Sequence, residues 1–324
     1  MKRLYPDTSS YMNGYLDTED GYSLYYEQSG APDGIPVLYL HGGPGAGLSP
    51  NYKSFFDANR YRIIAFEQRG CGRSQPFGSL TNNTTAHSLE DIQRLRQHLG
   101  IEQWVLFGGS WGATLALLSA IQHPHTVRGM VLRGVFLGRQ EDREWFLGPN
   151  GGAAHMFPEY YRQFIQGIDS PSVDSICQHY HNAFRQKCEL SRVAALKRWY
   201  LWEERLSRLV LPPGTGEFTA HYPVPLMTSL AKLECHYLIN RCFIENNYIL
   251  DNIHRIATIP ATVIHGRYDM ICKLEGADTL VRGWPAAQLQ IVADCGHSTS
   301  EPGIAHALCR ATRDMARFIE ENST

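Results

Sequence analysis

A glycine-flanked serine at positions 108–112 constrains the fold of this chain more than any other feature. The run reads Gly-Gly-Ser-Trp-Gly, with Ser110 at its centre. It follows the apolar run 104–107, which predicts a buried strand, and it precedes the apolar residues 113–120, which predict a helix. A turn that leads from a strand directly into a helix crowds the backbone, so it needs glycine on both sides of a strained serine. The pattern therefore predicts an exposed hydroxyl at a helix N-terminus, where developing negative charge is favoured.

A glycine-flanked serine is common by chance, but two downstream segments supply the partners that a nucleophile requires. A predicted strand over 262–266 leads to Asp269, and a second apolar run leads to His297. Both residues follow the C-terminal ends of strands, where open α/β sheets place their sites. The order serine, acid, histidine is one in which catalytic triads occur. We therefore predict that Ser110, Asp269 and His297 are catalytic. The rival acid, Asp294, shares a tight turn with the histidine and is predicted to be structural.

A small-residue loop near the start of the chain predicts an oxyanion hole. The apolar strand predicted at 36–40 runs into His-Gly-Gly-Pro-Gly at 41–45. A loop of this kind supplies one backbone N–H, and the residue after the nucleophile supplies the second. The two donors are then Gly43 and Trp111. An ordinary Gly-Pro turn is the alternative interpretation of the loop.

Five motifs taken together resemble those of the proline iminopeptidases, which are α/β-hydrolases that remove an N-terminal proline from peptides. They are His-Gly-Gly-Pro-Gly at 41–45, Gln-Arg-Gly-Cys-Gly-Arg-Ser at 68–74, Gly-Gly-Ser-Trp-Gly at 108–112, Gly-Arg-Tyr-Asp at 266–269, and Gly-His-Ser with Glu-Pro-Gly within 296–303. The resemblance extends from about Gly21 to the C-terminal helix. It implies an α/β-hydrolase fold, with a mostly parallel sheet covered by helices on both faces and a helical cap inserted between nucleophile and acid. It also implies a serine aminopeptidase.

Two segments of the predicted cap resemble family segments whose carboxylates bind the free α-amino group of the substrate. The resemblance implies Glu203 or Glu204, together with Glu234, as substrate-binding residues. An aminopeptidase must recognise a cation at a fixed distance from the scissile carbonyl, and enclosed carboxylates do this with charge-assisted hydrogen bonds. Solvated glutamates on cap helices are the alternative, and the flanking aromatic residues favour the enclosed setting.

Aromatic residues near the start of the cap are candidates for the slot that holds a pyrrolidine ring. Phe136 is the residue that we select, with Trp145 and Phe146 beside it. Packing of the cap onto the core is the alternative role for all three. Leu238 stands where the family usually has phenylalanine, which bears on the shape of this slot.

The pattern of strands and helices divides the chain into three parts. Residues 1–137 and 253–324 carry alternating strand and helix signals, which predict a mostly parallel sheet. Residues 138–252 carry helical signals alone and form the predicted cap. Strands are predicted near 22–27, 37–41, 61–66, 104–107 and 129–133, as well as around the acid and the histidine.

The sequence predicts one helix before the nucleophile, together with the residues at which this helix begins and ends. Leu89, Ile92, Leu95 and Leu99 recur at helical spacing. We predict Ser88 as the N-cap, Asp91 at the third position of a capping box, and Gly100 as the stop.

Composition excludes several classes of function. A formal net charge of −2 gives no basic footprint for nucleic acid or anionic membrane. The N-terminus lacks the apolar core of a secretory signal, and no apolar stretch approaches a membrane span. The eight cysteines show neither paired nor metal-ligand spacing, which predicts free thiols in a reducing cytoplasm. We expect no metal or organic cofactor, and the resemblance to the proline iminopeptidases implies small peptides with a free N-terminus as partners.

Two other functions remain open on the sequence. An esterase or amidase would carry the same triad and would not need a free α-amino group in its substrate. A catalytically silent binding protein of this fold would usually have lost a triad residue or the oxyanion loop, and this chain keeps all of them.

Overall fold

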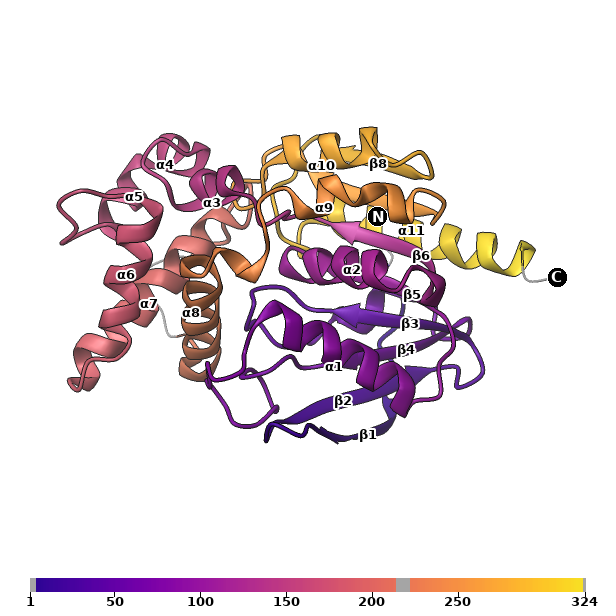
Figure 1. The fold of residues 1–324 in the computed structure, drawn as a ribbon. Helices are drawn as coiled ribbons and strands as arrows, with labels where there is room; N and C mark the ends of the chain where they lie inside the picture. The colour runs from indigo at the N-terminus through magenta and orange to yellow at the C-terminus, as the bar shows by residue number, and fades with distance from the viewer. Residues whose placement is uncertain (1–3, 214–221, 323–324) are drawn as a thin grey trace.

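The computed structural model describes residues 4–213 and 222–322, and its centre is a twisted eight-stranded sheet (Figure 1). The strand order is β1-β2-β4-β3-β5-β6-β7-β8. β1 pairs antiparallel with β2, and β2 pairs antiparallel with β4, whereas all later neighbours are parallel. The strands are β1 (Ser10–Asp17), β2 (Ser23–Gly30), β3 (Ile35–Leu40), β4 (Tyr61–Phe66), β5 (Trp104–Gly109), β6 (Val127–Arg133), β7 (Ala261–Gly266) and β8 (Ala287–Val292).

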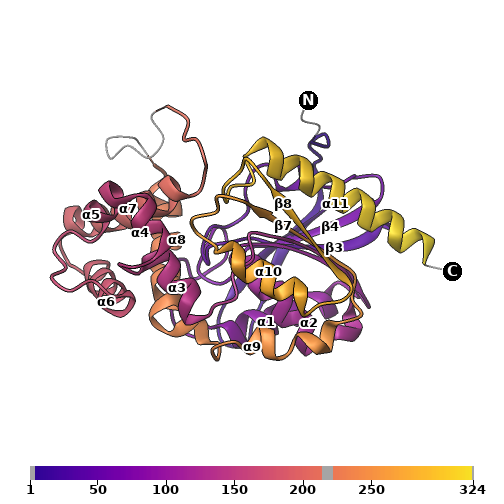
Figure 2. The same cartoon turned by 90° about the horizontal axis from the view of Figure 1, so that it is seen from above.

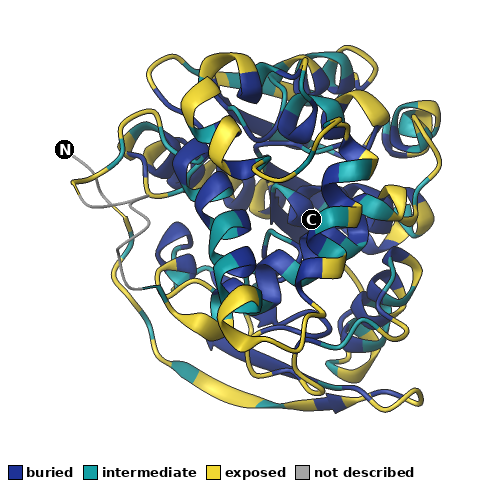
Figure 3. Ribbon diagram, turned by 90° about the vertical axis from the view of Figure 1, so that its left-hand side faces the viewer, coloured by how far each residue is buried: buried dark blue, intermediate teal, exposed yellow. Residues whose placement is uncertain are grey.

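Helices cover both faces of this sheet (Figure 2). On one face lie α1 (Thr85–His98), α2 (Trp111–Gln122), α9 (Tyr248–Asp251) and α10 (Leu274–Arg282), and on the other lies α11 (Pro302–Glu321). Each face has its own apolar core, one built around α2 and β5 and the other between α11, β4 and the 3₁₀ turn η1 (Tyr52–Phe55). Figure 3 shows the result, with buried residues concentrated in the central layers and exposed residues at the periphery.

A helical insertion lies between β6 and β7. It contains α3 (Gln140–Leu147), α4 (Gly152–Met156), α5 (Pro158–Phe164), α6 (Val173–Ala183), α7 (Glu189–Leu206), α8 (Val224–Ile239) and the 3₁₀ turn η3 (Arg241–Phe243). In Figure 1 the arrowheads of β3 and β6 point toward these helices, so the insertion faces the C-terminal ends of the parallel strands. The chain is back on the core by α9, which contacts α2, and the short turns η2 (Pro124–Thr126) and η4 (Ile253–Ile256) also belong to the core side.

The strand predictions are confirmed to within a few residues at each end. The mostly parallel sheet with helices on both faces is also confirmed. β1 was not predicted, because it is an edge strand with mainly exposed side chains and little apolar alternation. No helix among the described residues is long and apolar enough to cross a membrane.

The predicted N-cap of α1 is wrong. The helix begins one turn earlier, after Thr84, whose extended backbone makes it the N-cap. Ser88 lies inside the helix, and its hydroxyl is 3.3 Å from that of Tyr237. Asp91 forms a buried ion pair with Arg69 instead of closing a capping box. The prediction of the C-terminal end is correct to one residue, since α1 ends at His98.

Candidate active site

Ser110 occupies a strained turn between β5 and α2. Its backbone angles are φ 56° and ψ −123°, a conformation that costs free energy for any residue with a side chain. Glycine is required on both sides: a β-carbon on Gly108 would overlap the backbone of Gly112, and one on Gly112 would overlap the carbonyl of Leu40. The turn thus places the serine at the N-terminus of α2, as the motif predicts.

Asp269 and His297 meet at the ends of β7 and β8. The Nδ1 of His297 is 2.7 Å from Oδ2 of Asp269, and both side chains are buried. The other carboxylate oxygen of Asp269 accepts backbone N–H groups from Ile271 and Cys272, at 3.0 and 2.8 Å. Burial by itself would raise the pKa of Asp269, but the neighbouring His297 and these hydrogen bonds keep it below its usual value. The rival acid, Asp294, is exposed.

The other ring nitrogen of His297 is hydrogen-bonded to an arginine. Its Nε2 is 2.7 Å from Nη1 of Arg133, a donor, so Nε2 is the acceptor and Nδ1 carries the proton. Burial and the positive charge of Arg133 lower the pKa of His297, although Asp269 opposes them. Within the described residues no hydrogen bond joins Ser110 to His297, and the polar neighbour of the Ser110 hydroxyl is the Cys272 thiol at 3.9 Å.

A narrow cavity surrounds the serine. Gly43 and Trp111, the predicted oxyanion donors, line it together with Ser110. Its apolar wall includes Phe136, as predicted, and Leu238. Further wall residues are Phe146, Tyr237, Cys242 and Ile271, whereas Trp145 is not among them. The free volume is only about 20 Å³, little more than one water needs. The space beside the serine is therefore narrow in this conformation.

Two glutamates are enclosed beside this cavity. Glu234, on α8, lines it and accepts a hydrogen bond of 2.7 Å from Nε1 of Trp199. Glu203, on α7, is hydrogen-bonded to Glu234, and its Oε2 is buried with no hydrogen-bond partner. Burial, reinforced by the charge of Glu204, raises the pKa of Glu203 to about 7. Burial and the charge of Glu203 also raise the pKa of Glu234 well above its ordinary value.

Glu204 does not join this pair. Its carboxylate lies 3.6 Å from Nη1 of Arg208, one helical turn further along α7. Sequence reasoning left Glu203 and Glu204 as alternatives. The structure places Glu203 beside Glu234 and Glu204 in a partly exposed ion pair.

Sequence reasoning missed Arg133 and His265. Arg133 is the last residue of β6, and its guanidinium packs against the backbone at Gly109. His265, on β7, lies 3.4 Å from the Asp269 carboxylate. Arg133 ends the strand beside β5, and His265 lies near the end of the next strand, β7. Their position at the C-terminal ends of parallel strands is the signal that could have identified them.

The described residues contain one group with the proximity of metal ligands. Ligand atoms of Asp269, Cys272 and His297 lie within 4.8 Å of one another. Burial raises the pKa of the Cys272 thiol well above its ordinary value, and a thiolate is the form that binds metals. The acid and the histidine already hydrogen-bond each other, and this bond accounts for their proximity.

Comparisons with known proteins agree with this geometry. The profile of the alpha/beta hydrolase fold family matches residues 35–303. The chain is 41% identical to a probable proline iminopeptidase of Leptolyngbya boryana, over 100% of this chain and 99% of that protein. It is also 41% identical to a proline iminopeptidase of Xanthomonas citri, over 98% and 100% of the two chains. The chain belongs to the proline iminopeptidase family. An Arabidopsis thaliana member of this family is 40% identical over 98% of this chain and 83% of its own.

Solved structures of much lower sequence identity share the fold. VinJ superposes with a TM-score of 0.63 at 17% identity, covering 97% of this chain and 99% of its own. An esterase from Exiguobacterium antarcticum superposes with a TM-score of 0.59 at 19% identity, covering 97% and 100%. At this identity the likeness concerns the architecture alone.

Proposed function

We propose that this protein is a serine aminopeptidase that releases proline from the N-terminus of small peptides. The observation that carries the proposal is the position of Glu234, which lines the same cavity as Ser110 and is backed by Glu203. Neither carboxylate forms an ion pair within the described residues. An N-terminal ammonium group placed between them would provide the missing partner. Membership of the proline iminopeptidase family supports the same activity.

In the proposed reaction Ser110 attacks the carbonyl carbon of the N-terminal residue. His297 accepts the serine proton at Nε2 and then gives it to the leaving amine, while Asp269 holds the ring in the required tautomer. The bond that forms is the acyl ester, and the peptide C–N bond breaks; water then cleaves the ester by the same route. The backbone N–H groups of Gly43 and Trp111 would hold the oxyanion.

Arg133 adds a condition to this mechanism. Its guanidinium donates a hydrogen bond to Nε2 of His297, and a guanidinium does not accept a proton. Arg133 must therefore withdraw before the histidine can accept the serine proton. Catalytic hydrogen bonds often form only in the substrate complex. The narrow cavity is consistent with a substrate-free state in which the hydrogen bond between Ser110 and His297 has not yet formed.

Residues 138–252 would serve as the cap that carries the ammonium-binding carboxylates. Free thiols support a reducing compartment such as the cytoplasm, since all eight cysteines are unpaired. Small peptides with a free N-terminus would be the substrates.

The decisive experiment compares prolyl naphthylamide with its N-acetylated form. Acetylation removes the ammonium charge of the substrate and leaves the buried carboxylates without a partner. The loss should weaken binding of the substrate by roughly 2–5 kcal/mol. We expect kcat/KM to fall accordingly in the wild type and the difference to shrink in Glu234→Gln. Glu204→Gln is the matched control, because Glu204 pairs with Arg208, and it should keep the full difference. Equal cleavage of both substrates by the wild type would point to an esterase or amidase.

A further inference from the structure

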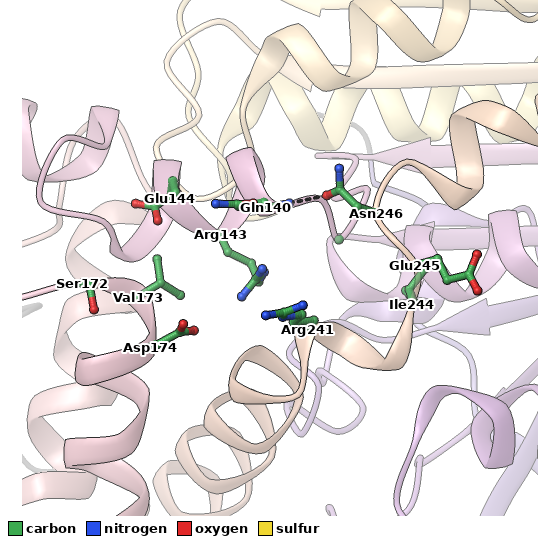
Figure 4. A pocket seen from close by; sticks show the side chains of 11 residues that line it. Gln140, Arg143, Glu144, Ser172, Val173, Asp174, Arg241, Ile244, Glu245 and Asn246 are labelled. Atoms are coloured by element: carbon green, nitrogen blue, oxygen red, sulfur yellow. Dashed lines mark hydrogen bonds between the residues drawn. The ribbon is translucent and has the colours of Figure 1, made fainter.

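A second cavity lies at the base of the helical insertion, where α3, the start of α6 and η3 meet (Figure 4). Its volume is about 270 Å³, close to the lower end for small-molecule sites, which is about 300 Å³. It shares no lining residue with the cavity around Ser110. The two are therefore separate spaces in this conformation.

A buried cation without an acidic partner projects into this second cavity. Arg143, on α3, is only 7% exposed, and its Nε has no hydrogen-bond partner. Its one hydrogen bond is a long one, 3.5 Å from Nη1 to the carbonyl of Leu238. A buried charge is normally paired, because removing it from water is costly. The unpaired state of Arg143 suggests that a ligand completes the site.

Arg241 brings a second guanidinium to the same place. Figure 4 shows that the head groups of Arg143 and Arg241 both extend into the space that the lining residues surround. Arg241 and the two residues after it have left-handed backbone angles, with φ between 52° and 56°. Non-glycine residues rarely adopt this conformation, and such strain concentrates at functional sites. Among the described residues no carboxylate pairs with Arg241.

The α3 and α6 side of the cavity also carries acidic side chains that are equally unpaired. Asp174, in the first turn of α6, and Glu144, on α3, both line the cavity. Neither forms an ion pair within the described parts of the chain. In Figure 4 they lie on the α3 and α6 side of the space, across from Arg241. A third carboxylate, that of Glu245, also lines the cavity, but Figure 4 shows it pointing away from the arginine head groups. The central space is thus bordered by two cations and two anions that form no ion pair with one another within the described residues.

We propose that this cavity binds a small zwitterion, a free α-amino acid or a dipeptide. The carboxylate of the ligand would lie against Arg143 and Arg241, which can bind it through several N–H donors. Its ammonium group would lie against Asp174 and Glu144. A simple anion would meet the two acidic side chains, and a simple cation would meet the two arginines. A zwitterion pairs with both sets and fits the volume.

The test is calorimetric titration of the full chain with glycylglycine. N-acetylglycylglycine keeps the carboxylate alone, and glycylglycinamide keeps the ammonium alone. Losing one charged contact should weaken binding by roughly tenfold or more. Arg241→Gln and Asp174→Asn should each weaken glycylglycine binding to the same degree. Arg241 is exposed, so its replacement tests the site even if Arg143→Gln fails to fold.

Two controls separate this site from other surfaces. Arg282→Gln removes an exposed cation on α10 and should leave the affinity unchanged. Glu234→Gln alters the cavity around Ser110, and it too should leave the affinity unchanged. The proposal is overturned if glycylglycine does not bind, if the singly charged analogues bind equally well, or if Arg241→Gln and Asp174→Asn have no effect. A loss of affinity in Glu234→Gln would also overturn it, since binding would then occur at the catalytic site.

Discussion

At the scale of single residues, two groups of the site titrate in different pH ranges. The pKa of Glu203 is raised to about 7, whereas the pKa of His297 is lowered from 6.5. The ammonium group of a substrate requires ionised carboxylates, and the general base requires a neutral histidine. Lowering the pH below about 7 should therefore reduce kcat/KM first through the glutamate pair. In Glu203→Gln this acid limb should move to lower pH, and an unchanged profile would contradict the assignment.

The same shift has a consequence for stability. A carboxyl whose pKa is higher in the folded state binds its proton more tightly there than in the unfolded chain. The unfolding free energy should thus fall as pH rises from 4.5 to about 7, the interval between the model-peptide pKa and that of Glu203. Glu203→Gln should become more stable relative to wild type at pH 8 than at pH 5 in urea unfolding. Glu204→Gln removes only the smaller cause of the raised Glu203 pKa, so it should show the same trend at a smaller size.

Ser110 gives the most direct prediction at this scale. Ser110→Ala should lower kcat by about 10⁶, because the nucleophile is lost and only the rest of the site contributes. The melting temperature should stay at the wild-type value or rise slightly, since Ala fits the same turn. Near-normal turnover of prolyl naphthylamide by this variant would rule out the proposed mechanism.

The sequence predicts that Ser110, Asp269 and His297 lie at the C-terminal ends of strands, where the structure has them, but it does not predict the contact between Arg133 and His297. Motifs and strand ends place Ser110, Asp269 and His297 at one edge of the sheet. The side chain that faces Nε2 depends on the distance between β6 and the loop after β8, and on which rotamer fits there. Neither the distance nor the rotamer can be predicted from the local sequence pattern. The choice between Glu203 and Glu204 likewise depended on which side of α7 packs against α8.

At the scale of elements, the loop after β7 places a cysteine next to Ser110. Cys272 lies 3.9 Å from the Ser110 hydroxyl. Burial raises the pKa of its thiol, so reaction with a maleimide should be slow, but a bound group would block the serine. Cys272→Ala should keep most activity and lose this inhibition. Cys295→Ala should remain as sensitive as wild type, because Cys295 is buried against Gly303 and Val292. Inhibition that persists in Cys272→Ala would contradict this account.

The start of α1 shows why element boundaries are the hardest feature to predict. Ser88 followed by Asp91 is a valid capping pattern, yet the helix continues one turn further back. Thr85 lies in that extra turn, and its hydroxyl donates a 2.5 Å hydrogen bond to the carbonyl of Cys242. This bond joins residues 157 positions apart. A tertiary contact of this range overrides a local preference of about 1 kcal/mol.

At the scale of the whole molecule, the helical insertion and the core are joined at His297, the proposed general base. The backbone N–H groups of His297 and Ser298 both donate to the carbonyl of Ser207, at 3.0 and 2.7 Å. Ser207 directly follows α7. Glu301 adds to this link, since its carboxylate accepts backbone N–H groups from Gly296 and Leu209. The insertion therefore cannot move away without releasing the loop that holds the histidine.

Because of this link, the exchange rates of two amide protons should report how often the insertion moves away from the core. An amide exchanges with solvent deuterium when its hydrogen bond breaks, and those of His297 and Ser298 are bonded across the boundary between insertion and core. They should exchange at the opening rate of the insertion, faster than the amides in the centre of β5. Glu301→Gln should speed them further without changing β5. Deuterium exchange measured by mass spectrometry on the free protein would then report how often the insertion separates from the core in the absence of any substrate.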